Sequence, residues 1–460
     1  MFEDIPVEVS LAHAGERIRK NDTYVELGGP DVKEKFELVK VRQSDQVNDG
    51  VITVIGPDIA DMEPYKSYPI GIMIEIAGPE LEPDFEGVIE RRIHEYANYI
   101  EGFMHLNQRY DVWIRLSKKA FSRGFTTLKF VGNVLERLLK NEFPIIERIQ
   151  ITFYTDVEKI SPVYAEAKSA YEARDARARG LTDDDVDVFY GCALCQSFAP
   201  NHVCVITPQR YANCGAISWF DGCAAARMDP KGLIFPIEKG KCLDPEKGEY
   251  TGVNESAKKR SLGAVTRVYL YSAFTFPHTS CGCFEGIAFY IPEVDGFGIV
   301  TRGYRETTVN GLSFSTMADS TGGGRQIDGF HGISLEYMRS SKFLSADGGY
   351  TRVVWMPADL KEQMRPFIPA DLLEKISTEN DVKNVDELRG FLIKNSHPII
   401  KRWKVDYEKS EEGREETPVF SGEDAVITFG GFKFTLKNAK IYADRVTIQS
   451  IKPKKPGAGE

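Results

Sequence analysis

Six of the eight cysteines lie in two short stretches whose spacing is suited to binding metal. Four of them follow the pattern C-x2-C-x8-C-x9-C, at Cys192, Cys195, Cys204 and Cys214. Four thiolates are the ligands that an iron-sulfur cubane needs. A structural zinc site usually has two short cysteine knuckles, and only the first pair here has that form. The stretch therefore favours an iron-sulfur cluster, with zinc as the alternative.

The other two cysteines are Cys281 and Cys283, separated by Gly282. If the amides of Gly282 and Cys283 lose their protons, the tripeptide offers two sulfurs and two nitrogens in one plane, a donor set that suits Ni(II) or Cu(II). Glycine lacks the Cβ that would restrict such a tight wrap. The alternative for an isolated C-G-C is a buried pair of thiols or a strained disulfide. The four-cysteine stretch in the same chain favours the chelate.

Both stretches carry a family resemblance. It rests on Cys192-Ala-Leu-Cys-Gln-Ser-Phe-Ala-Pro-Asn-His-Val-Cys204, Cys214-Gly-Ala-Ile-Ser-Trp219 and Ser280-Cys-Gly-Cys-Phe-Glu285, and it continues through Tyr24-Val-Glu-Leu-Gly-Gly29, Phe85-Glu-Gly-Val-Ile-Glu-Arg-Arg92, Thr321-Gly-Gly-Gly324 and Ser345-Ala-Asp-Gly-Gly349. These segments resemble acetyl-CoA synthase of the carbon monoxide dehydrogenase/acetyl-CoA synthase system, most closely the archaeal beta subunit of the acetyl-CoA decarbonylase/synthase complex. Bacterial members carry an additional N-terminal domain that meets the dehydrogenase and guides CO, and we expect no counterpart in this chain.

The resemblance implies a cluster of iron, sulfur and nickel. Cys192, Cys195, Cys204 and Cys214 would hold a [4Fe-4S] cubane, and Cys195 would bridge it to a proximal nickel. Cys281 and Cys283 would bridge that nickel to a distal one, which both sulfurs and the backbone nitrogens of Gly282 and Cys283 would bind. Phe198 fits a family pattern in which an aromatic side chain walls the substrate pocket of the proximal nickel, and an ordinary core aromatic is the alternative.

The reaction implied by the resemblance is a reversible acyl transfer. A methyl group from a methylated corrinoid iron-sulfur protein would join CO, and CoA would capture the acetyl group. Carbon monoxide dehydrogenase subunits are implied partners, and ferredoxin is a further candidate. Because the metal carries the bond making, we expect no Ser/His/Asp triad, and the protein contributes geometry, dielectric and access.

CoA needs cations for its phosphates and a flat surface for its adenine. The richest mixture of basic and aromatic side chains is Arg91, Arg92, Arg109, Trp113, Arg115, Lys118 and Lys119. Guanidinium groups suit phosphate recognition. A solvated helix face explains the charges equally well, so the first domain carries a candidate CoA site.

Composition excludes several classes of protein. With 460 residues, 42% hydrophobic and 27% charged, the chain is long enough for two or three globular domains. A net charge of -10 argues against a general nucleic-acid binder. No apolar run is long enough to span a membrane, and the N-terminus lacks the regions of a signal peptide. We therefore expect a cytoplasmic protein with no membrane or nucleic-acid partner, whose cysteines serve metal or redox chemistry.

We expect an α/β and α+β multidomain fold. The first domain, residues 1–160, is predicted to be α/β, with strands at 36–41, 51–55, 70–76 and 149–154 and helices at 131–140 and over one long segment from Phe85 to Met104. Residues 161–180 are predicted to form a connecting helix opened by Ser161-Pro162, after which Thr182 caps a short helix that delivers Cys192.

The second domain, residues 181–405, is predicted to be an α+β metal-cluster domain. Its expected elements are strands at 265–270 and 353–356 and a helix at 385–395 opened by Asn384; 286–291 and 298–301 fit helix or buried strand equally. Thr321-Gly-Gly-Gly-Arg325 lacks the Walker lysine and the G-x-G-x-x-G spacing, which favours a turn over a phosphate loop.

Residues 406–460 are predicted to be an acidic linker followed by a small β segment. A hairpin is expected at 426–429 and 432–436, a third strand at 441–448, and disorder in the last ten residues. We expect this segment to tie the chain to its complex. A hairpin folded back on its own domain is the alternative.

The rival function is an iron-sulfur electron-transfer or scaffold protein without catalysis. The Cys281-Gly-Cys283 chelate discriminates against it, because an electron carrier has no use for a second dithiolate site. Cys223 and Cys242 are predicted to be spare thiols. His202 and His278 flank ligand cysteines, where they either tune the cluster or simply pack.

Overall fold

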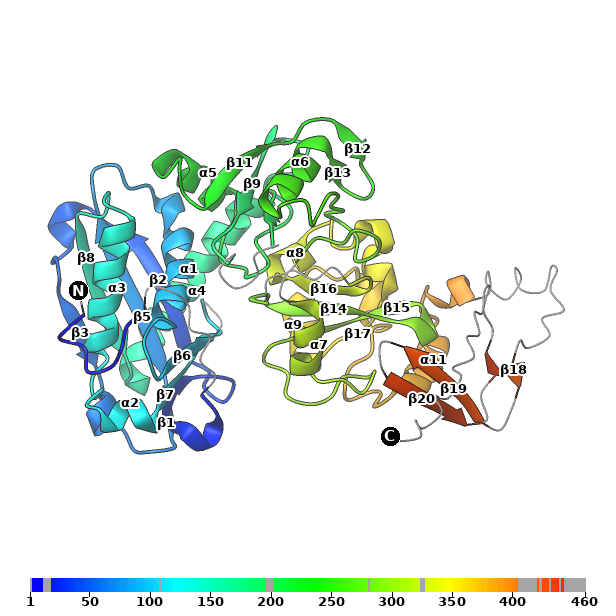
Figure 1. Ribbon diagram of the computed structural model, residues 1–460, viewed down its shortest axis with the longest axis horizontal. Coiled ribbons are helices and arrows are strands. Elements are labelled where there is room, and N and C mark those ends of the chain that lie inside the picture. The colour runs from blue at the N-terminus through cyan, green and yellow to red at the C-terminus, as the bar shows by residue number, and fades with distance from the viewer. Residues whose placement is uncertain are drawn as a thin grey trace, which may run out of the picture. The chain divides into compact units, whose positions relative to one another are not determined.

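The structure is a computed structural model that describes most of the chain (Figure 1). It describes residues 2–10, 18–106, 109–195, 202–279, 282–322, 327–403, 420–421, 424–429, 432–437 and 440–441. The chain divides into two compact units, Met1–Ile400 and Lys401–Glu460. The first unit holds all the cysteines. Its mixed α/β content, distributed over several sheets, confirms the predicted fold class.

A four-stranded mixed sheet organises the first part of this unit. Its order is β2-β5-β8-β3, formed by β2 (Lys35–Val41), β5 (Ile70–Ala77), β8 (Arg148–Tyr154) and β3 (Ile52–Ile55). β2 runs parallel to β5, β5 antiparallel to β8, and β3 parallel to β8. All four strands were predicted from their apolar patterns.

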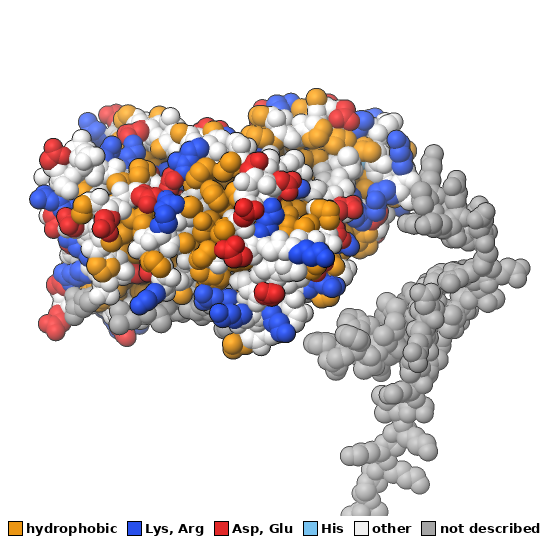
Figure 2. Space-filling model, turned by 90° about the horizontal axis from the view of Figure 1, so that it is seen from above, with side chains coloured by type: hydrophobic (Ala, Val, Ile, Leu, Met, Phe, Trp, Pro, Cys, Tyr) orange, Lys and Arg blue, Asp and Glu red, His pale blue; other side chains and the backbone are white. Residues whose placement is uncertain are grey.

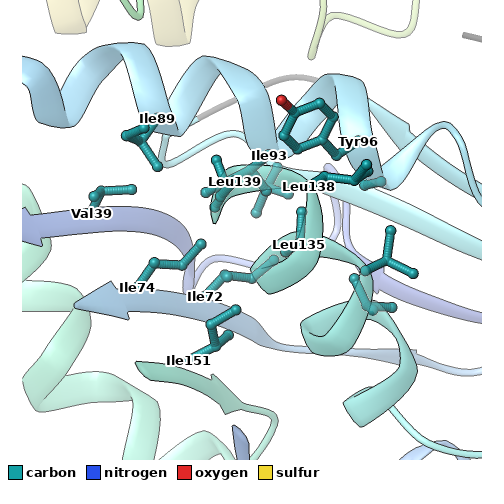
Figure 3. Close-up of a cluster of buried hydrophobic side chains, with 14 of the residues drawn as sticks. Val39, Ile72, Ile74, Ile89, Ile93, Tyr96, Leu135, Leu138, Leu139 and Ile151 are labelled. Carbon is teal, nitrogen blue, oxygen red and sulfur yellow. The ribbon is translucent and has the colours of Figure 1, made fainter. Parts of the chain in front are cut away.

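Helices cover both faces of this sheet because alternate residues of a strand point to opposite sides. α1 (Glu86–Ala97) and α3 (Lys129–Glu142) pack on one face, and α4 (Val157–Arg179) packs on the other. Val39 of β2 therefore faces α1, whereas its neighbour Leu38 faces α4. Figure 3 shows the first of these layers, with side chains of the sheet meeting those of the two helices at Val39, Ile72, Ile74, Ile89, Ile93, Leu135 and Leu139.

The predicted long helix from Phe85 to Met104 is wrong in its second half. α1 ends at Ala97, and residues 103–106 form a strand instead. The side-chain amide of Asn98 donates to the backbone oxygens of both His94 and His105, at 2.7 and 2.8 Å. The backbone amide of His105 donates back to Asn98 Oδ1 at 3.0 Å. These three hydrogen bonds of Asn98 turn the chain from helix to strand. Hydrophobic spacing does not reveal such an effect.

A second sheet lies beside the first in the order β4-β1-β7-β6. It consists of β4 (Ser67–Tyr68), β1 (Thr23–Gly28), β7 (Trp113–Ser117) and β6 (Phe103–Leu106). The short helix α2 (Lys118–Ser122) follows β7 in the chain. β6 places His105 under α1, which matters for the site below.

Two predicted helix starts are wrong. α4 begins at Val157, because Asp156 caps it by accepting hydrogen bonds from the amides of Glu158 and Lys159. The predicted cap residue, Ser161, lies inside the helix together with Pro162. Thr182 does not open a helix: its amide and hydroxyl both donate to Asp185 in a turn, and Cys192 arrives at the end of a strand.

The cysteine region is built on a three-stranded antiparallel sheet in the order β10-β9-β11. Its elements are β9 (Val188–Cys192), β10 (Cys204–Ile206) and β11 (Ile234–Glu238), with α5 (Trp219–Met228), β12 (Cys242–Asp244), β13 (Glu249–Tyr250) and α6 (Thr251–Arg260) around it. The predicted strand at 265–270 is wrong, since this segment contributes one isolated bridge, between Tyr269 and Pro277. Its apolar side chains instead fill a small core with Phe189 and Tyr250.

A last sheet, in the order β16-β14-β15-β17, completes the unit. Its strands are β14 (Gly286–Ile291), β15 (Gly296–Thr301), β16 (Phe330–Ile333) and β17 (Val353–Trp355), with helices α7 (Phe314–Thr321), α8 (Leu335–Arg339), α9 (Ala358–Met364), α10 (Ala370–Leu373) and α11 (Val385–Lys394). Residues 286–291 and 298–301, for which helix and strand fitted equally well, are therefore strands. The structure confirms β17 and α11, whose predicted cap Asn384 accepts a hydrogen bond from the amide of Glu387 at 2.9 Å.

The surface mixes charges of both signs. Figure 2 shows Lys and Arg side chains interspersed with Asp and Glu and with hydrophobic side chains over one face. Among the described residues no helix is both long and apolar enough to cross a membrane.

In the second unit, β19 (Asp424–Phe429) and β20 (Phe432–Lys437) form the predicted antiparallel hairpin. β18 (Phe420–Ser421) pairs with β21 (Lys440–Ile441), where the predicted third strand begins. The predicted linker at 408–417 and the last ten residues lie outside the described part of the chain.

Candidate metal centre

Two neighbouring strands bring the first and third cysteines of the motif together. Cys192 at the end of β9 is the direct antiparallel partner of Cys204 at the start of β10. After Cys192 the chain continues along β11, where the amide of Ala193 donates to Leu233 O at 2.8 Å, and reaches Cys195. All three cysteines are buried. Two cysteines of the motif thus face each other across a strand pair.

Cys214 is presented by a tight turn. Gly215 has a φ of +75°, and a Cβ at this position would lie 2.2 Å from the carboxyl group of Glu285. Glu285 follows the C-G-C segment closely, and its amide donates to Asn213 O at 3.1 Å. Its carboxyl accepts from the amide of Leu335 at 2.7 Å, and burial raises its pKa to about 7. Glu285 therefore joins the Cys214 turn to the segment that carries Cys283.

The four cysteines of the motif surround one cavity. This small cavity is lined by Arg91, Cys192, Cys195, His202, Cys204, Ala212, Asn213 and Cys214. Within the described residues, no three His, Cys, Asp or Glu side chains converge closely enough to hold a single ion. The thiols thus line a shared space and do not meet at a point.

Arg91 of α1 contributes a charged side chain to the lining of this cavity. Its Nη2 donates to Cys195 Sγ at 2.9 Å, while its Nε and Nη1 have no hydrogen-bond partner among the described residues. Burial opposes its charge, but negative charge on Cys195, Cys283 and Cys214 raises the pKa of Arg91 well above its usual value. A guanidinium that is 2% exposed needs an anionic partner. The two remaining nitrogen atoms of Arg91, Nε and Nη1, can donate to such an anionic partner.

Burial opposes ionisation of three of the four thiols. Burial raises the pKa of Cys204 to about 11 and that of Cys214 to about 12, and it raises the pKa of Cys192 well above its usual range. Metal binding to such thiols must expel protons, and the gain in metal-sulfur bonding then offsets the cost of burial.

The C-G-C segment reaches the same place from far along the sequence. The side chain of Cys283 packs against that of Cys195. Gly282 has a φ of +109°, and no atom lies within 4 Å of the position where a Cβ would be. Arg302 follows Thr301, the last residue of β15, and donates to the backbone oxygens of Gly282 and, at 3.2 Å, of Phe284. Arg302 therefore fixes the peptide group that precedes Cys283 and the one that follows Phe284.

A histidine from the first sheet layer completes the surroundings of Cys283. His94 Nε2 of α1 lies 3.9 Å from Cys283 Sγ. α1 therefore contributes one side chain to each half of the centre, Arg91 to Cys195 and His94 to Cys283. The two residues are at positions i and i+3, so both point from the same face of the helix.

Comparisons with known proteins match both halves of the chain. The family model described as CO dehydrogenase/acetyl-CoA synthase complex beta subunit matches residues 5–160, and the model for the C-terminal part of the ACS/CODH beta subunit matches residues 171–404. The acetyl-CoA decarbonylase/synthase complex subunit beta of Methanothermobacter thermautotrophicus is 53% identical over 98% of this chain and 100% of its own length. The chain belongs to this beta-subunit family.

Other members of the beta-subunit family are similarly close. The beta subunit of Methanopyrus kandleri is 52% identical over 97% of this chain and 97% of its own length. A solved structure of the C-terminal domain of an acetyl-coenzyme A synthase alpha subunit is 39% identical, covering 26% of this chain and 96% of that chain, with a TM-score of 0.24.

Two histidines that flank the cysteine segments in this family member, His202 and His278, are buried. Burial lowers the pKa of His202 to about 4 and that of His278 well below its usual value. His202 Nδ1 lies 3.2 Å from Thr279 Oγ1, and the ring contributes to the cavity wall. His278 Nε2 accepts from the amide of Val205 at 2.9 Å. His278 therefore supports the strand after Cys204, and His202 faces the space between the thiols.

The predicted CoA residues do not share one surface. Arg91 lies against the cysteines. Arg92 pairs with Glu95 and Glu142, and Arg109 pairs with Asp175 at 3.0 Å, all of them buried or half-buried. CoA binding by these arginines stays a prediction.

Two guanidinium groups lie over the ring of Trp113. The guanidinium of Arg115 lies 4.5 Å from its ring centroid and that of Arg305 4.4 Å. Arg115 also pairs with Glu26, while Lys118 and Lys119 lie on α2 next along the chain. Arg305, which the sequence did not single out, is brought to Trp113 by the tertiary fold alone.

The remaining predicted residues are one pocket residue, Phe198, one ligand, Cys281, and the two spare thiols, Cys223 and Cys242. Phe198 and Cys281 lie outside the described residues, so the structure does not bear on their roles. Cys223 on α5 accepts a hydrogen bond from Arg227 at 2.7 Å, and Cys242 is exposed on β12. Neither contributes to the cavity lined by the motif cysteines.

Sequence reasoning missed His94, Glu285 and Arg302, and it did not foresee that Arg91 lies against Cys195. Isolated charged or histidine residues in a helix or strand carry no spacing signal. Only the packing of α1 and β15 against the cysteine segments shows what these residues touch.

Proposed function

We propose that this chain is the member of its complex that joins a methyl group, CO and CoA into acetyl-CoA, reversibly, at a nickel-nickel-[4Fe-4S] cluster. The observation that carries the proposal is the convergence of the two cysteine segments, in which Cys283 packs against Cys195 at the edge of a cavity lined by four thiols. An iron-sulfur protein that only transfers electrons has no need of the second segment.

The donor set fits this cofactor chemically. The four thiols that line one cavity are the ligands that an iron-sulfur cubane needs. Arg91 supplies positive charge beside Cys195, and its two remaining buried donors suit a group that bears negative charge. When bound, the nickel-iron-sulfur group supplies the formation and cleavage of the carbon-carbon and thioester bonds.

The protein's own residues would hold and orient this group. Cys192, Cys195, Cys204 and Cys214 would ligate the cubane, and Cys195, Cys281 and Cys283 would carry the nickels together with the backbone nitrogens of Gly282 and Cys283. Arg302 donates to Gly282 O, the oxygen of the peptide group whose nitrogen belongs to Cys283. A cation on that oxygen stabilises negative charge in the peptide group, which supports nitrogen ligation there.

The partners proposed are those of the family: carbon monoxide dehydrogenase subunits, a methylated corrinoid iron-sulfur protein and, as a further candidate, ferredoxin. CoA would bind near the Trp113 face, where Arg115 and Arg305 stack on the indole. We keep Phe198 as the proposed wall of the substrate pocket.

Replacing Cys283 with Ala in anaerobically purified protein tests the proposal. We expect loss of nickel and of acetyl-CoA synthesis, with iron content and the cubane's absorption largely retained, because the four cysteines of the cubane remain. The matched control is Cys242→Ala, which removes an exposed thiol and should change neither metal. Retained synthesis in the Cys283 variant, or wild-type protein that contains iron but no nickel, would contradict the proposal.

A further inference from the structure

A buried chain of three side chains leads away from Cys283 into the first sheet layer. His94 Nε2 lies 3.9 Å from Cys283 Sγ, and His94 Nδ1 lies 2.9 Å from His105 Nδ1. His105 Nε2 then forms a short hydrogen bond with Glu37 Oε1. The three residues come from α1, β6 and β2, so no local sequence pattern links them.

The chain is isolated from water. Glu37 and His105 are 0% exposed and His94 is 6% exposed. Asn98 holds the two histidines in place by donating to the backbone oxygens of both, as described above. Glu37 is fixed in turn through its backbone, whose oxygen accepts a hydrogen bond from the Tyr171 hydroxyl. A fully buried polar array of this kind has one geometry and few alternatives.

The contact between the two Nδ1 atoms restricts where the protons lie. One Nδ1 must donate and the other must accept, so when both rings are neutral the hydrogen bonds of the chain all run in one direction or all in the other. In the first arrangement protons point from Glu37 toward Cys283. In the second they point from His94 back toward Glu37, and the lone pair of His94 Nε2 faces the sulfur.

A metal-bound Cys283 selects the first arrangement. A thiolate can only accept, so His94 Nε2 carries the proton, and the Nδ1 of a neutral His94 then accepts from His105 Nδ1. His105 Nε2 then either accepts from a protonated Glu37 carboxyl or, as part of an imidazolium, donates to a Glu37 carboxylate. In both cases the Glu37-His105 pair holds one proton more than a carboxylate and a neutral imidazole.

We infer that Glu37 and His105 are positioning residues that fix His94 in the tautomer whose Nε2–H donates to the Cys283 thiolate, and that Glu37 is the neutral donor at the far end. The inference rests on the proposed nickel site, because it takes Cys283 as a metal-bound thiolate. It assigns a role to three residues that are not ligands of the proposed cluster. Groups of this kind orient ligands and tune metal affinity.

The surroundings of Glu37 support a neutral carboxyl. Its Oε2 has no hydrogen-bond partner among the described residues, which is less costly for the carbonyl oxygen of an acid than for a carboxylate. Burial and the nearby negative charge of Glu90 raise the pKa of Glu37, although His105 acts in the opposite direction.

Two uncharged replacements of Glu37 separate hydrogen-bond donation from loss of charge or volume. Glu37→Gln keeps a donor for His105 Nε2, whereas Glu37→Met has a similar size and no donor. The nickel-to-iron ratio of each anaerobically purified protein is measured before and after challenge with a chelator. We expect Glu37→Gln to retain nickel like the wild type and Glu37→Met to lose it roughly 10-fold more readily, with iron unchanged.

The control is Glu86→Gln, which removes the charge of another buried glutamate on α1 without interrupting the chain. It should keep the wild-type ratio. If Glu37→Met does not fold, the double variant Glu37→Met/His105→Phe, which replaces both partners with apolar groups, takes its place with the same expected loss of nickel.

Vibrational difference spectra provide a readout that does not depend on the metals. The protonated carboxyl stretch of the wild type should disappear in Glu37→Gln and persist in Glu86→Gln. Equal nickel loss in the Gln and Met variants, no loss in either, or the absence of a carboxyl band that depends on Glu37 would overturn the inference. Absence of nickel from the wild type would instead overturn the proposed function.

Discussion

The sheet layer of β2, β5, β8 and β3 and the cysteine centre are both buried, but they are completed in different ways. In the sheet layer, apolar side chains from strands and helices fill the space between them, as Figure 3 shows. In the centre, four thiols line an enclosed space and Arg91 keeps two buried donors without a partner among the described residues. The comparison indicates that the layer is stabilised by its own packing, whereas the centre depends on the charged group that we propose it binds.

The two regions are joined through α1. Its apolar side, with Ile89 and Ile93, packs on the sheet, and its other side carries Arg91 and His94 to the cysteines. The layer therefore acts as a rigid support for residues that act in the centre. The predictions below test how far stability and metal binding can be separated, in order of decreasing expected effect.

The largest effect is expected from Arg91→Met. Removing one partner of a buried charge interaction costs about 3–5 kcal/mol. Here this cost reduces the stability of the centre with its metals bound. We expect iron to be lost along with nickel, as measured by metal analysis and the cluster's absorption. The matched control is Arg92→Met, the next residue of α1, which breaks buried ion pairs with Glu95 and Glu142 but should retain iron. Equal iron content in the two variants would mean that Arg91 is only structural.

An intermediate effect is expected from Ile74→Ala in the middle of β5. Ile74 is fully buried in the sheet layer, and a truncation of this kind costs about 2–5 kcal/mol of unfolding free energy. Denaturant unfolding should show this loss while the iron and nickel content per folded molecule stays at the wild-type value. Loss of iron in proportion to stability would show instead that the two regions fold as one cooperative unit.

The smallest effect is the difference between two glycine replacements. Gly215→Ala and Gly263→Ala both place a side chain at positive φ, +75° and +86°, which costs about 1–2 kcal/mol. Only at Gly215 does the new Cβ meet another group, the Glu285 carboxyl, so a further cost of about 1–3 kcal/mol is expected there. Thermal unfolding and iron content measure the difference. Identical behaviour of the two variants would show that Glu285 moves aside and does not hold the Cys214 turn.

The local elements of the fold were predictable where one force dominates. The apolar alternation of residues 70–76 and the cap at Asn384 predict β5 and α11, because burial of one face and satisfaction of a helix end are local effects. The same reasoning failed from Ile100 to Met104, where side-chain bonds from Asn98 end the helix that the spacing predicts. It also failed at Val265–Leu270, whose apolar residues fill a core without forming a strand.

The sequence by itself determined the candidate ligand set and its chemistry, since the number and spacing of the cysteines and the glycine between Cys281 and Cys283 are properties of adjacent residues. Only the tertiary structure decided which other side chains serve that set. Arg91, His94 and Arg302 reach the cysteines from separate parts of the chain, and Glu37 acts through two histidines. The physical reason is that charges and hydrogen bonds in a buried site are matched across the fold, between residues that are far apart in the sequence, and such matching leaves no periodic trace along the chain.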